Sequence, residues 1–327
     1  MNSGGSLKES VISDSVDGMW LLYISERHSL NNIITIYIII MQDVTILILT
    51  KNEEINLPDC LESVKDFAKR CVVVDSYSTD RTKEIALKYG ADFFEHKFEN
   101  YARQFNWGLD NTNITTKWTF RLDADERLTP ALCKELDQLM TEHADDDVNG
   151  FTMEASLYFM GREMKHGGPQ KRKLMLFKTG IGRVENRKMD EHTILSSGRA
   201  ISCKNKFLHY DFKDMTFWIS KLNWYATREM QDYFDYKNGK DQHVATNDKE
   251  IAALRGKKFG IYYKFPKFVR AWLSFVYEYI FLFGFLDGKE GFIYHWTYCC
   301  FYRCLVDAKI LEQEKNPKPF VETGDLK

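Results

Sequence analysis

Trp118-Thr-Phe-Arg-Leu-Asp-Ala-Asp-Glu-Arg127 is the stretch around which the sequence is organised. Its apolar run ends abruptly in Asp123-Ala124-Asp125-Glu126. Alternate side chains of an extended chain share a face, so Asp123 and Asp125 can point the same way. An unperturbed aspartate has a pKa of about 3.9, so two ionised carboxylates would repel each other. A hard divalent ion, Mg²⁺ or Mn²⁺, relieves that repulsion and usually brings a phosphate. The alternative is a strand that ends in a solvated acidic turn.

The composition is that of an ordinary soluble protein of 327 residues, of which 44% are hydrophobic and 28% charged. A chain of this length can bury a full core in one large domain or in two. The formal net charge of -2 gives no electrostatic support for nucleic-acid binding. Because the seven cysteines include no two Cys-x-x-Cys pairs, their spacing disfavours zinc, and we expect a reduced, cytoplasmic setting.

Residues 1–40 read as a poorly specified N-terminal extension. Residues 33–40 are apolar and β-branched, but they are too few to span a bilayer and lack the features of a signal peptide. One hypothesis is that Met41 is the natural start of the protein; the alternative is a genuine extra strand or a surface anchor. We predict an α/β domain over residues 41–213 and a helical region over residues 214–327.

Alternating apolar and amphipathic segments follow Met41. They predict strands over 44–50, 71–75, 91–95 and 117–122, and helices over 57–68, 82–89 and 101–110. Such alternation implies right-handed crossovers and a mostly parallel sheet. Ligands of these sheets bind beyond the carboxyl ends of the strands. Polar clusters at 50–53, 75–80 and 123–126 lie at three such ends, which indicates a binding site.

The second half continues with a helix from 130 to 143 and strands over 151–160, 172–177, 184–189 and 201–207. A helix over 217–236 and a polar linker over 238–250 follow. Residues 257–306 are aromatic and partly basic, and they contain two apolar segments interrupted by polar residues. They predict either a tightly packed helical subdomain or a helix pair that lies in the membrane interface.

Further motifs follow the strand exits. They are Gln104-x-Asn106, Gly167-Gly168 followed by Arg172 to Phe177, Asp190-Glu191, His209-Tyr210 and Gly284-Phe-Leu-Asp-Gly288. Together with Thr50-x-Asn52-Glu53, Asp75-Ser-x-Ser-Thr-Asp80 and the Asp-x-Asp stretch, they resemble family 2 glycosyltransferases. The resemblance covers roughly residues 43–310 and is greatest to the lipopolysaccharide core glucosyltransferase-like branch. It implies a GT-A fold, with a nucleotide-sugar-binding α/β half joined to an acceptor-binding half, and sugar transfer with inversion.

The resemblance implies a set of nucleotide-sugar contacts: Thr50, Asn52, Glu53, Asp75, Ser76, Ser78, Gln104, Asn106, Asp123, Gly168 and Arg172. Asp75 is expected to accept a hydrogen bond from uracil. The alternative is a helix N-cap, a role that Ser78 or Asp80 suits better. Gly167 and Gly168 would let the backbone approach the donor sugar, or they form an ordinary turn.

The reaction also needs a cation and a base. Asp125 is the first expected ligand of Mg²⁺ or Mn²⁺, Asp123 reaches the metal or the ribose, and His209 completes the metal shell unless it is a structural histidine. The general base is expected at Glu191, with Asp190 as the other candidate because this branch commonly has His at that position. An exposed acidic turn is the alternative interpretation of this pair.

These residues favour a metal-dependent, inverting transferase that moves a sugar, glucose being the family's commonest, from a UDP-sugar donor to a glycan or glycolipid acceptor of the cell envelope. We expect a cytoplasmic protein, peripheral at the inner face of the cytoplasmic membrane through residues 257–306, and no nucleic-acid partner. The alternatives are a polyprenyl-phosphate sugar synthase and a non-catalytic nucleotide-sugar-binding module. An Asp-x-Asp phosphatase ranks last, because that chemistry usually places the motif on the first strand.

Overall fold

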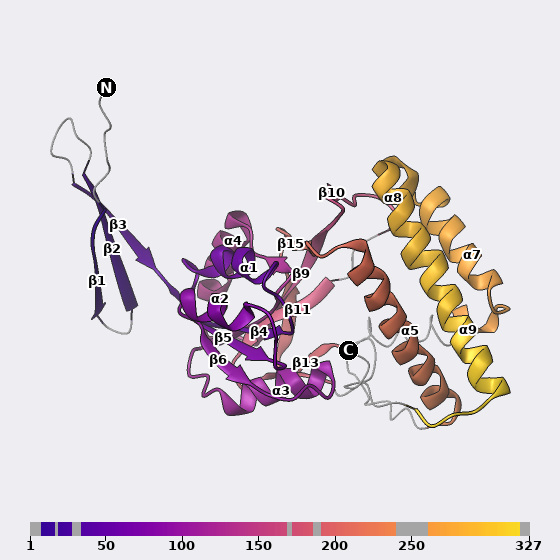
Figure 1. Cartoon of the computed structure of the whole chain (residues 1–327). Helices are drawn as coiled ribbons and strands as arrows, with labels where there is room; N and C mark the ends of the chain where they lie inside the picture. Colours follow the sequence, from indigo (N-terminus) through magenta and orange to yellow (C-terminus); the bar gives the residue numbers. More distant parts are fainter. Residues whose placement is uncertain are drawn as a thin grey trace.

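The computed structural model describes residues 8–16, 19–27, 34–168, 172–185, 191–239 and 261–320. A central sheet with helices on both faces forms one part, and a group of helices formed by the last third of the chain packs beside it (Figure 1). The predicted α/β fold with a mostly parallel central sheet and a C-terminal helical region is confirmed. The division at residues 40 and 213 stays a prediction.

Four parallel strands make one half of the central sheet. Their order is β6 (Asp92–Glu95), β5 (Ala68–Asp75), β4 (Gln42–Thr50) and β7 (Trp118–Asp123). The crossovers between them are α1 (Leu57–Val64), α2 (Thr82–Lys88) and α3 (Tyr101–Asn111). The first predicted helix ends early, since β5 begins at Ala68, three residues before the predicted start of the strand.

The other half of the sheet has mixed directions. Its strands are β11 (Arg172–Lys178), antiparallel to both β7 and β9 (Val148–Phe159), and then β14 (Arg199–Ser202) and β15 (Phe207–Tyr210), both parallel to β9. Two short strands extend this half: β8 (Glu126–Arg127) pairs with β15, and β10 (Arg162–Glu163) pairs with β9. A separate two-stranded sheet is formed by β12 (Gly182–Val184) and β13 (Thr193–Leu195).

The strand predicted over 201–207 is therefore two strands. Between them, the backbone amides of Lys204 and Asn205 donate to Glu135 on α4 (Pro130–Glu142), which fixes the break. The strand predicted over 184–189 ends at Val184, and residues 186–190 lie outside the described residues, as does most of the predicted linker over 238–250.

Continuous apolar strands are expected here because helices cover both sheet faces. Ile46, Ile48 and Val73 pack in one cluster with α1 and α4, whereas Leu47 and Val72 pack on the other face with Phe105 of α3. These side chains are all fully buried, so the core holds the polar strand ends in fixed positions.

The C-terminal helices pack around α5 (Met215–Lys237) and α9 (Tyr302–Lys315). The remaining elements are η1 (Tyr262–Lys264), α7 (Val269–Val276), the π-helical turn η2 (Tyr277–Phe281), η3 (Gly284–Asp287), α8 (Gly288–His295) and the π-helical turn η4 (Trp296–Phe301). Within this group, α5 lies on the side that faces the central sheet, and α7 lies on the far side (Figure 1).

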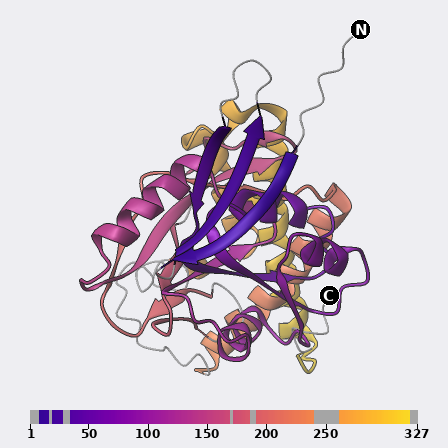
Figure 2. The same ribbon diagram turned by 90° about the vertical axis from the view of Figure 1, so that its left-hand side faces the viewer.

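Three antiparallel strands precede the central sheet: β1 (Lys8–Val16), β2 (Met19–Arg27) and β3 (Ile34–Ile40). They form a sheet of their own at the end of the molecule opposite the C-terminal helices (Figures 1 and 2). Residues 34–40 form a strand, and both hypotheses for the natural start of the protein stay predictions.

Candidate active site

Three strand ends meet at the carboxyl edge of the parallel sheet. Thr50 on β4 pairs with Asp75 on β5, and Leu49 pairs with Asp123 on β7. The Thr50 hydroxyl donates a hydrogen bond of 2.7 Å to Oδ1 of Asp75. The polar clusters predicted at three strand exits are therefore neighbours in space.

Asp75 is held by the loop that follows it. Its Oδ1 accepts from the Ser78 hydroxyl and its Oδ2 from the Ser78 amide, each at 2.6 Å. Asp80, not Asp75, accepts from the amide of Thr82, the first residue of α2, so Asp75 is not a helix cap. Because a carboxylate oxygen can accept two hydrogen bonds, Oδ2 keeps capacity for one more donor.

Asn52 ties the loops after β4 and β5 together. Its amide donates to the Ser78 hydroxyl at 2.7 Å, and its Oδ1 accepts from the Thr79 amide at 2.8 Å. Ser76 donates its amide to Thr50 O, and its hydroxyl accepts from Gln104. These bonds hold the predicted nucleotide-binding rim in one conformation; the ligand roles of its residues stay predictions.

The two residues of the Gln-x-Asn motif are engaged within the protein. Gln104 is fully buried, and its Nε2 donates to His96 O at 3.0 Å. Asn106 donates to Val184 O at 2.8 Å and accepts from Val184 N at 3.1 Å. Both ends of the Asn106 side chain therefore pair with β12, and its nucleotide contact stays a prediction.

Asp123 and Asp125 diverge although they alternate in sequence. Asp123 Oδ1 accepts from the Tyr101 hydroxyl at 2.7 Å, and its Oδ2 lies 3.7 Å from Lys173 Nζ. Asp125 Oδ2 instead lies 3.2 Å from His209 Nε2. The role of Asp123, metal ligand or ribose contact, stays a prediction, whereas Asp125 and His209 lie together as their predicted roles require.

The Asp125 side chain, which is 15% exposed, lies close to His209 and Lys221. Burial opposes its ionisation, but His209 and then Lys221 outweigh that effect and hold the pKa of Asp125 well below its usual range. Lys221 Nζ lies 3.6 Å from Asp125 Oδ2 and 3.4 Å from Asp211 Oδ2. Carboxylate oxygens and an imidazole nitrogen are donors that suit a divalent ion, so these residues fit the predicted Mg²⁺ or Mn²⁺.

Two further acids of this edge are Glu53, whose side chain is 18% exposed, and Glu126, which is buried. Burial raises the pKa of Glu53, against the effect of Lys213, whose Nζ donates to Glu53 Oε1 at 2.6 Å. Burial likewise raises the pKa of Glu126, against the effect of Lys173, which donates to Glu126 Oε1 at 2.7 Å. Each acid is thus paired with a lysine from another part of the chain.

Glu191, the first candidate for the base, contacts α5. Arg228 Nη2 donates to Glu191 Oε1, and Arg228 is itself buried against the ring of Trp224. Burial raises the pKa of Glu191, although Arg228 opposes that rise. Asp190, the other candidate, lies outside the described residues.

Two predicted donor contacts lie elsewhere. Neighbouring residues of β11 point to opposite faces, so Lys173 reaches the acids while Arg172 turns away and donates to Cys203 O at 3.1 Å. Gly168 lies against Leu282, and a Cβ on Gly167 would lie 2.0 Å from His295 Cε1. The Gly-Gly loop therefore packs on the C-terminal helices, and Asp287 of the Gly-Phe-Leu-Asp-Gly motif accepts from the His166 amide at 2.9 Å.

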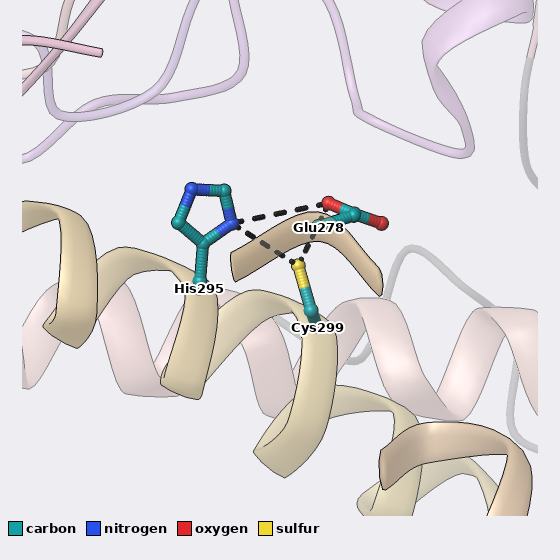
Figure 3. A group of neighbouring side chains, drawn as sticks. All are labelled: Glu278, His295 and Cys299. Carbon is teal, nitrogen blue, oxygen red and sulfur yellow. Dashed lines mark hydrogen bonds and ion pairs between the residues drawn. The ribbon is translucent and has the colours of Figure 1, made fainter. Parts of the chain in front are cut away.

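A second group of metal-ligand types lies within those helices (Figure 3). Ligand atoms of Glu278, His295 and Cys299 lie within 4.8 Å of one another, which no other group of three achieves among the described residues. The Cys299 thiol donates to Glu278 Oε2 at 2.9 Å and lies 3.7 Å from His295 Nδ1. These contacts fasten η4 and α8 to η2.

The sequence reasoning missed four cations: Lys173, Lys213, Lys221 and Arg228. Periodicity offered a signal for two of them, because Lys221 and Arg228 are seven residues apart and share one face of α5. Lys173 was obscured by its neighbour Arg172, since a sequence does not tell which of two adjacent strand residues faces the site. Lys213 precedes α5 and carries no local signal.

An acidic strand edge lined with lysines suits an anionic ligand together with a divalent cation. The chain belongs to glycosyl transferase family 2, whose model matches residues 45–198. It is a glycosyltransferase of the GT-A fold, a class that typically uses a divalent metal and a nucleotide-sugar donor. The predicted family, fold and enzyme class are confirmed.

Among its relatives, the lipopolysaccharide core biosynthesis glycosyltransferase LpsC of Rhizobium meliloti is 30% identical over 187 residues, which are 55% of this chain and 67% of that protein. An uncharacterized glycosyltransferase of Rickettsia prowazekii is 28% identical over 121 residues, 37% of this chain and only 41% of the relative. Among solved structures, S. aureus TarS 1-349 matches with a TM-score of 0.40 and 12% identity, over 85% of this chain and 93% of the other.

Proposed function

We propose that this protein is an inverting, metal-dependent glycosyltransferase that moves a sugar from a UDP-sugar to a cell-envelope glycan such as the lipopolysaccharide core, with UDP-glucose as the first donor to test. The observation that carries the proposal is the 3.2 Å approach of His209 Nε2 to Asp125 Oδ2 at the carboxyl edge of the sheet. The similarity to LpsC, a protein named for lipopolysaccharide core biosynthesis, supports this class of acceptor.

The nucleotide is proposed to bind at the rim formed by the loops after β4 and β5. Asp75 Oδ2 has the capacity to accept from the N3–H of uracil. Tyr77, which is 53% exposed and next in the loop to Ser76 and Ser78, offers an aromatic face to the base. Asp123, oriented by the Tyr101 hydroxyl, would accept from a ribose hydroxyl.

The diphosphate is proposed to lie between Asp125 and the lysines. A divalent ion held by Asp125 and His209 would act as a Lewis acid on the leaving diphosphate. In the structure, Lys213 pairs with Glu53. Lys221 pairs with Asp125 and Asp211. Their ammonium groups can shift to phosphate oxygens, since each is a flexible point charge. The lysines thereby stabilise the negative charge that develops as the sugar departs.

Glu191 is proposed to take the proton of the acceptor hydroxyl as that hydroxyl attacks the anomeric carbon from the side opposite the diphosphate. The Arg228 guanidinium holds the carboxylate in one orientation and favours its ionised form, whereas burial keeps it basic. A base with a raised pKa accepts a proton more readily near neutral pH than an exposed glutamate does.

Calorimetry of UDP binding with and without Mn²⁺ tests the donor site. Wild type should bind UDP in a Mn²⁺-dependent manner, and Asp125→Asn should weaken that binding at least about 100-fold. Asp110→Asn, which alters an exposed ion pair with Arg183, is the matched control and should bind as wild type. If wild type fails to bind UDP with Mn²⁺ present, the UDP assignment is wrong, and GDP- and dTDP-sugars come next.

A polyprenyl-phosphate sugar synthase is the second candidate, because the C-terminal helices expose many aromatic residues that suit a lipid carrier. Turnover separates the candidates: transfer to polyprenyl phosphate favours the synthase, and transfer to a core glycan favours the first proposal. A non-catalytic binding module would bind the donor and turn over neither acceptor. The proposal includes a cytoplasmic location at the inner face of the membrane.

A further inference from the structure

The C-terminal helices expose one uniformly apolar surface. Between Phe268 and Leu286, every exposed side chain is aliphatic or aromatic. Phe281 is 66% exposed, Tyr277 57%, Phe283 56% and Trp272 49%. We call the exposed side chains of residues 268–286 the aromatic face. A contiguous apolar surface of this kind marks a site that another apolar phase or partner covers.

The charged residues of the same segment are turned inward. Arg270 is buried and pairs with the buried Asp307 of α9. Glu278 accepts from the Cys299 thiol, and the buried Asp287 accepts from His166. The segment therefore pairs its charges inside and shows apolar groups outside, which is the reverse of a water-facing helix.

The shape of the segment suits insertion into one leaflet. None of the helices in the described part of the chain is long and apolar enough to cross a bilayer alone. The arms Val269–Phe281 and Gly284–Lys315 are bent by 73° at a short break, a geometry compatible by length and composition with a broken span or a re-entrant loop. Phe281 and Phe283, two of the most exposed residues, stand at that bend.

Charge and aromatic type point to a lipid surface rather than to a protein. Exposed Lys264 and Lys289 flank the apolar run at its two ends, where they would meet anionic headgroups. Trp272, Tyr277 and Trp296 lie among the exposed aromatic residues, and such side chains favour the membrane–water interface. A hollow of about 470 Å³, lined by Tyr279, Phe285 and Phe292 together with Lys289, opens beside the face.

We propose that the aromatic face docks into the boundary between headgroups and acyl chains of one leaflet of an anionic bilayer, with the bend at Phe281–Phe283 as its deepest point. The inference deepens the proposed function, because it places a lipid-anchored acceptor within reach of the enzyme. It is tested without any transfer reaction, so it can fail while the donor site stands.

The experiment is co-sedimentation of the full chain with vesicles of phosphatidylglycerol and phosphatidylethanolamine, and with vesicles of phosphatidylcholine alone. Wild type should bind the anionic vesicles more tightly. Phe281→Ser with Phe283→Asn should lower the partition coefficient at least about tenfold, since two large apolar groups are removed. Asn is chosen at 283 because the backbone there has φ of 61°, which Asn tolerates.

The matched control is Leu87→Ser with Tyr89→Ser, which removes two exposed apolar groups near the end of α2 and should leave the partition coefficient unchanged. Mn²⁺-dependent UDP binding, measured without vesicles, verifies that each variant is folded and keeps the donor site separate from the result. The proposal is overturned if wild type does not bind vesicles, or if both double variants bind equally. Self-association through the aromatic face, detected by light scattering and abolished by the 281/283 variant without any vesicle binding, would also overturn it.

Discussion

Lys221 and Arg228 stand two turns apart on one face of α5, and each contacts one of the two acids to which the reaction is assigned. Lys221 approaches Asp125, the first candidate metal ligand, and Arg228 donates to Glu191, the candidate base. Seven residues of helix span about 10 Å, so one rigid element sets the spacing of both groups. Under the proposed function, the first helix of the C-terminal region is therefore part of the catalytic centre.

Substitution of Arg228 should move the pH dependence of the reaction. Burial raises the pKa of Glu191 and Arg228 opposes that rise, so Arg228→Met should raise the pKa further. A base must be unprotonated to work, and activity is therefore lost as pH falls through its pKa. The acid limb of kcat/KM should shift to higher pH in Arg228→Met, measured by initial rates across pH.

Loss of the buried guanidinium also threatens folding, because it leaves Glu191 unpaired at a cost of about 3–5 kcal/mol. Arg228→Lys keeps the charge and serves as the control; its acid limb should lie nearer to that of wild type. If both variants keep the wild-type profile while UDP binding is normal, Glu191 is not the titrating base.

Lys221→Met should change metal and nucleotide affinity in opposite directions. The ammonium group lies 3.6 Å from Asp125 Oδ2, where it repels a divalent cation but attracts a diphosphate. Without it, Mn²⁺ alone should bind as tightly as to wild type or more tightly, whereas UDP with Mn²⁺ should bind about tenfold more weakly. Calorimetry gives both constants. A parallel loss of both would mean that Lys221 serves folding rather than the diphosphate.

Asn106→Leu should lower kcat with little effect on UDP affinity. The variant removes two hydrogen bonds to Val184 and leaves two backbone groups of β12 unpaired, at a cost of about 1–3 kcal/mol for each buried group. Since β12 leads toward Glu191, its displacement should affect the base more than the donor site. If the variant instead loses UDP affinity while kcat is unchanged, Asn106 contacts the nucleotide, as predicted from the sequence.

Much of the fold could be predicted from the sequence, because local patterns of apolar and polar residues agree with the strands and helices of the structure. The runs 44–50 and 71–75 are mostly apolar, as strands covered on both faces are expected to be, and each ends in a polar cluster. The proximity of Asp125 and His209 was predicted from motifs rather than from periodicity. The two residues are distant in sequence, and β15 places His209 opposite Glu126, 83 positions earlier in the chain. Strand ends and motifs were therefore sufficient to predict which residues lie together at this edge, whereas their roles toward a donor stay predictions.

The remainder depends on contacts between segments that are distant in sequence. A double glycine indicates close approach but not by what, so Gly168 was assigned to a sugar although it packs against Leu282. Arg172 and Lys173 are equally basic, and only strand register decides which of them meets Glu126. Arg228 looked like one charge on an aromatic helix, because its partner Glu191 is fixed by tertiary packing alone.

The Gly-Gly loop offers a test of its own role. Gly167 has φ of 90°, and an added Cβ would lie 2.0 Å from Cε1 of His295, which is only 1% exposed and has no room to move aside. Gly167→Ala should therefore lower the free energy of unfolding by about 2–4 kcal/mol, the sum of backbone strain and overpacking. Gly168, with φ of 116°, shares the backbone strain, but its added Cβ would lie 3.2 Å from the flexible Leu282 side chain, so Gly168→Ala should cost less through a smaller overpacking part. Thermal melts measure both, and His295→Ala combined with Gly167→Ala should recover the overpacking part.

If Gly167→Ala instead melts as wild type but loses affinity for the UDP-sugar and not for UDP, the loop binds the donor sugar, as predicted from its sequence.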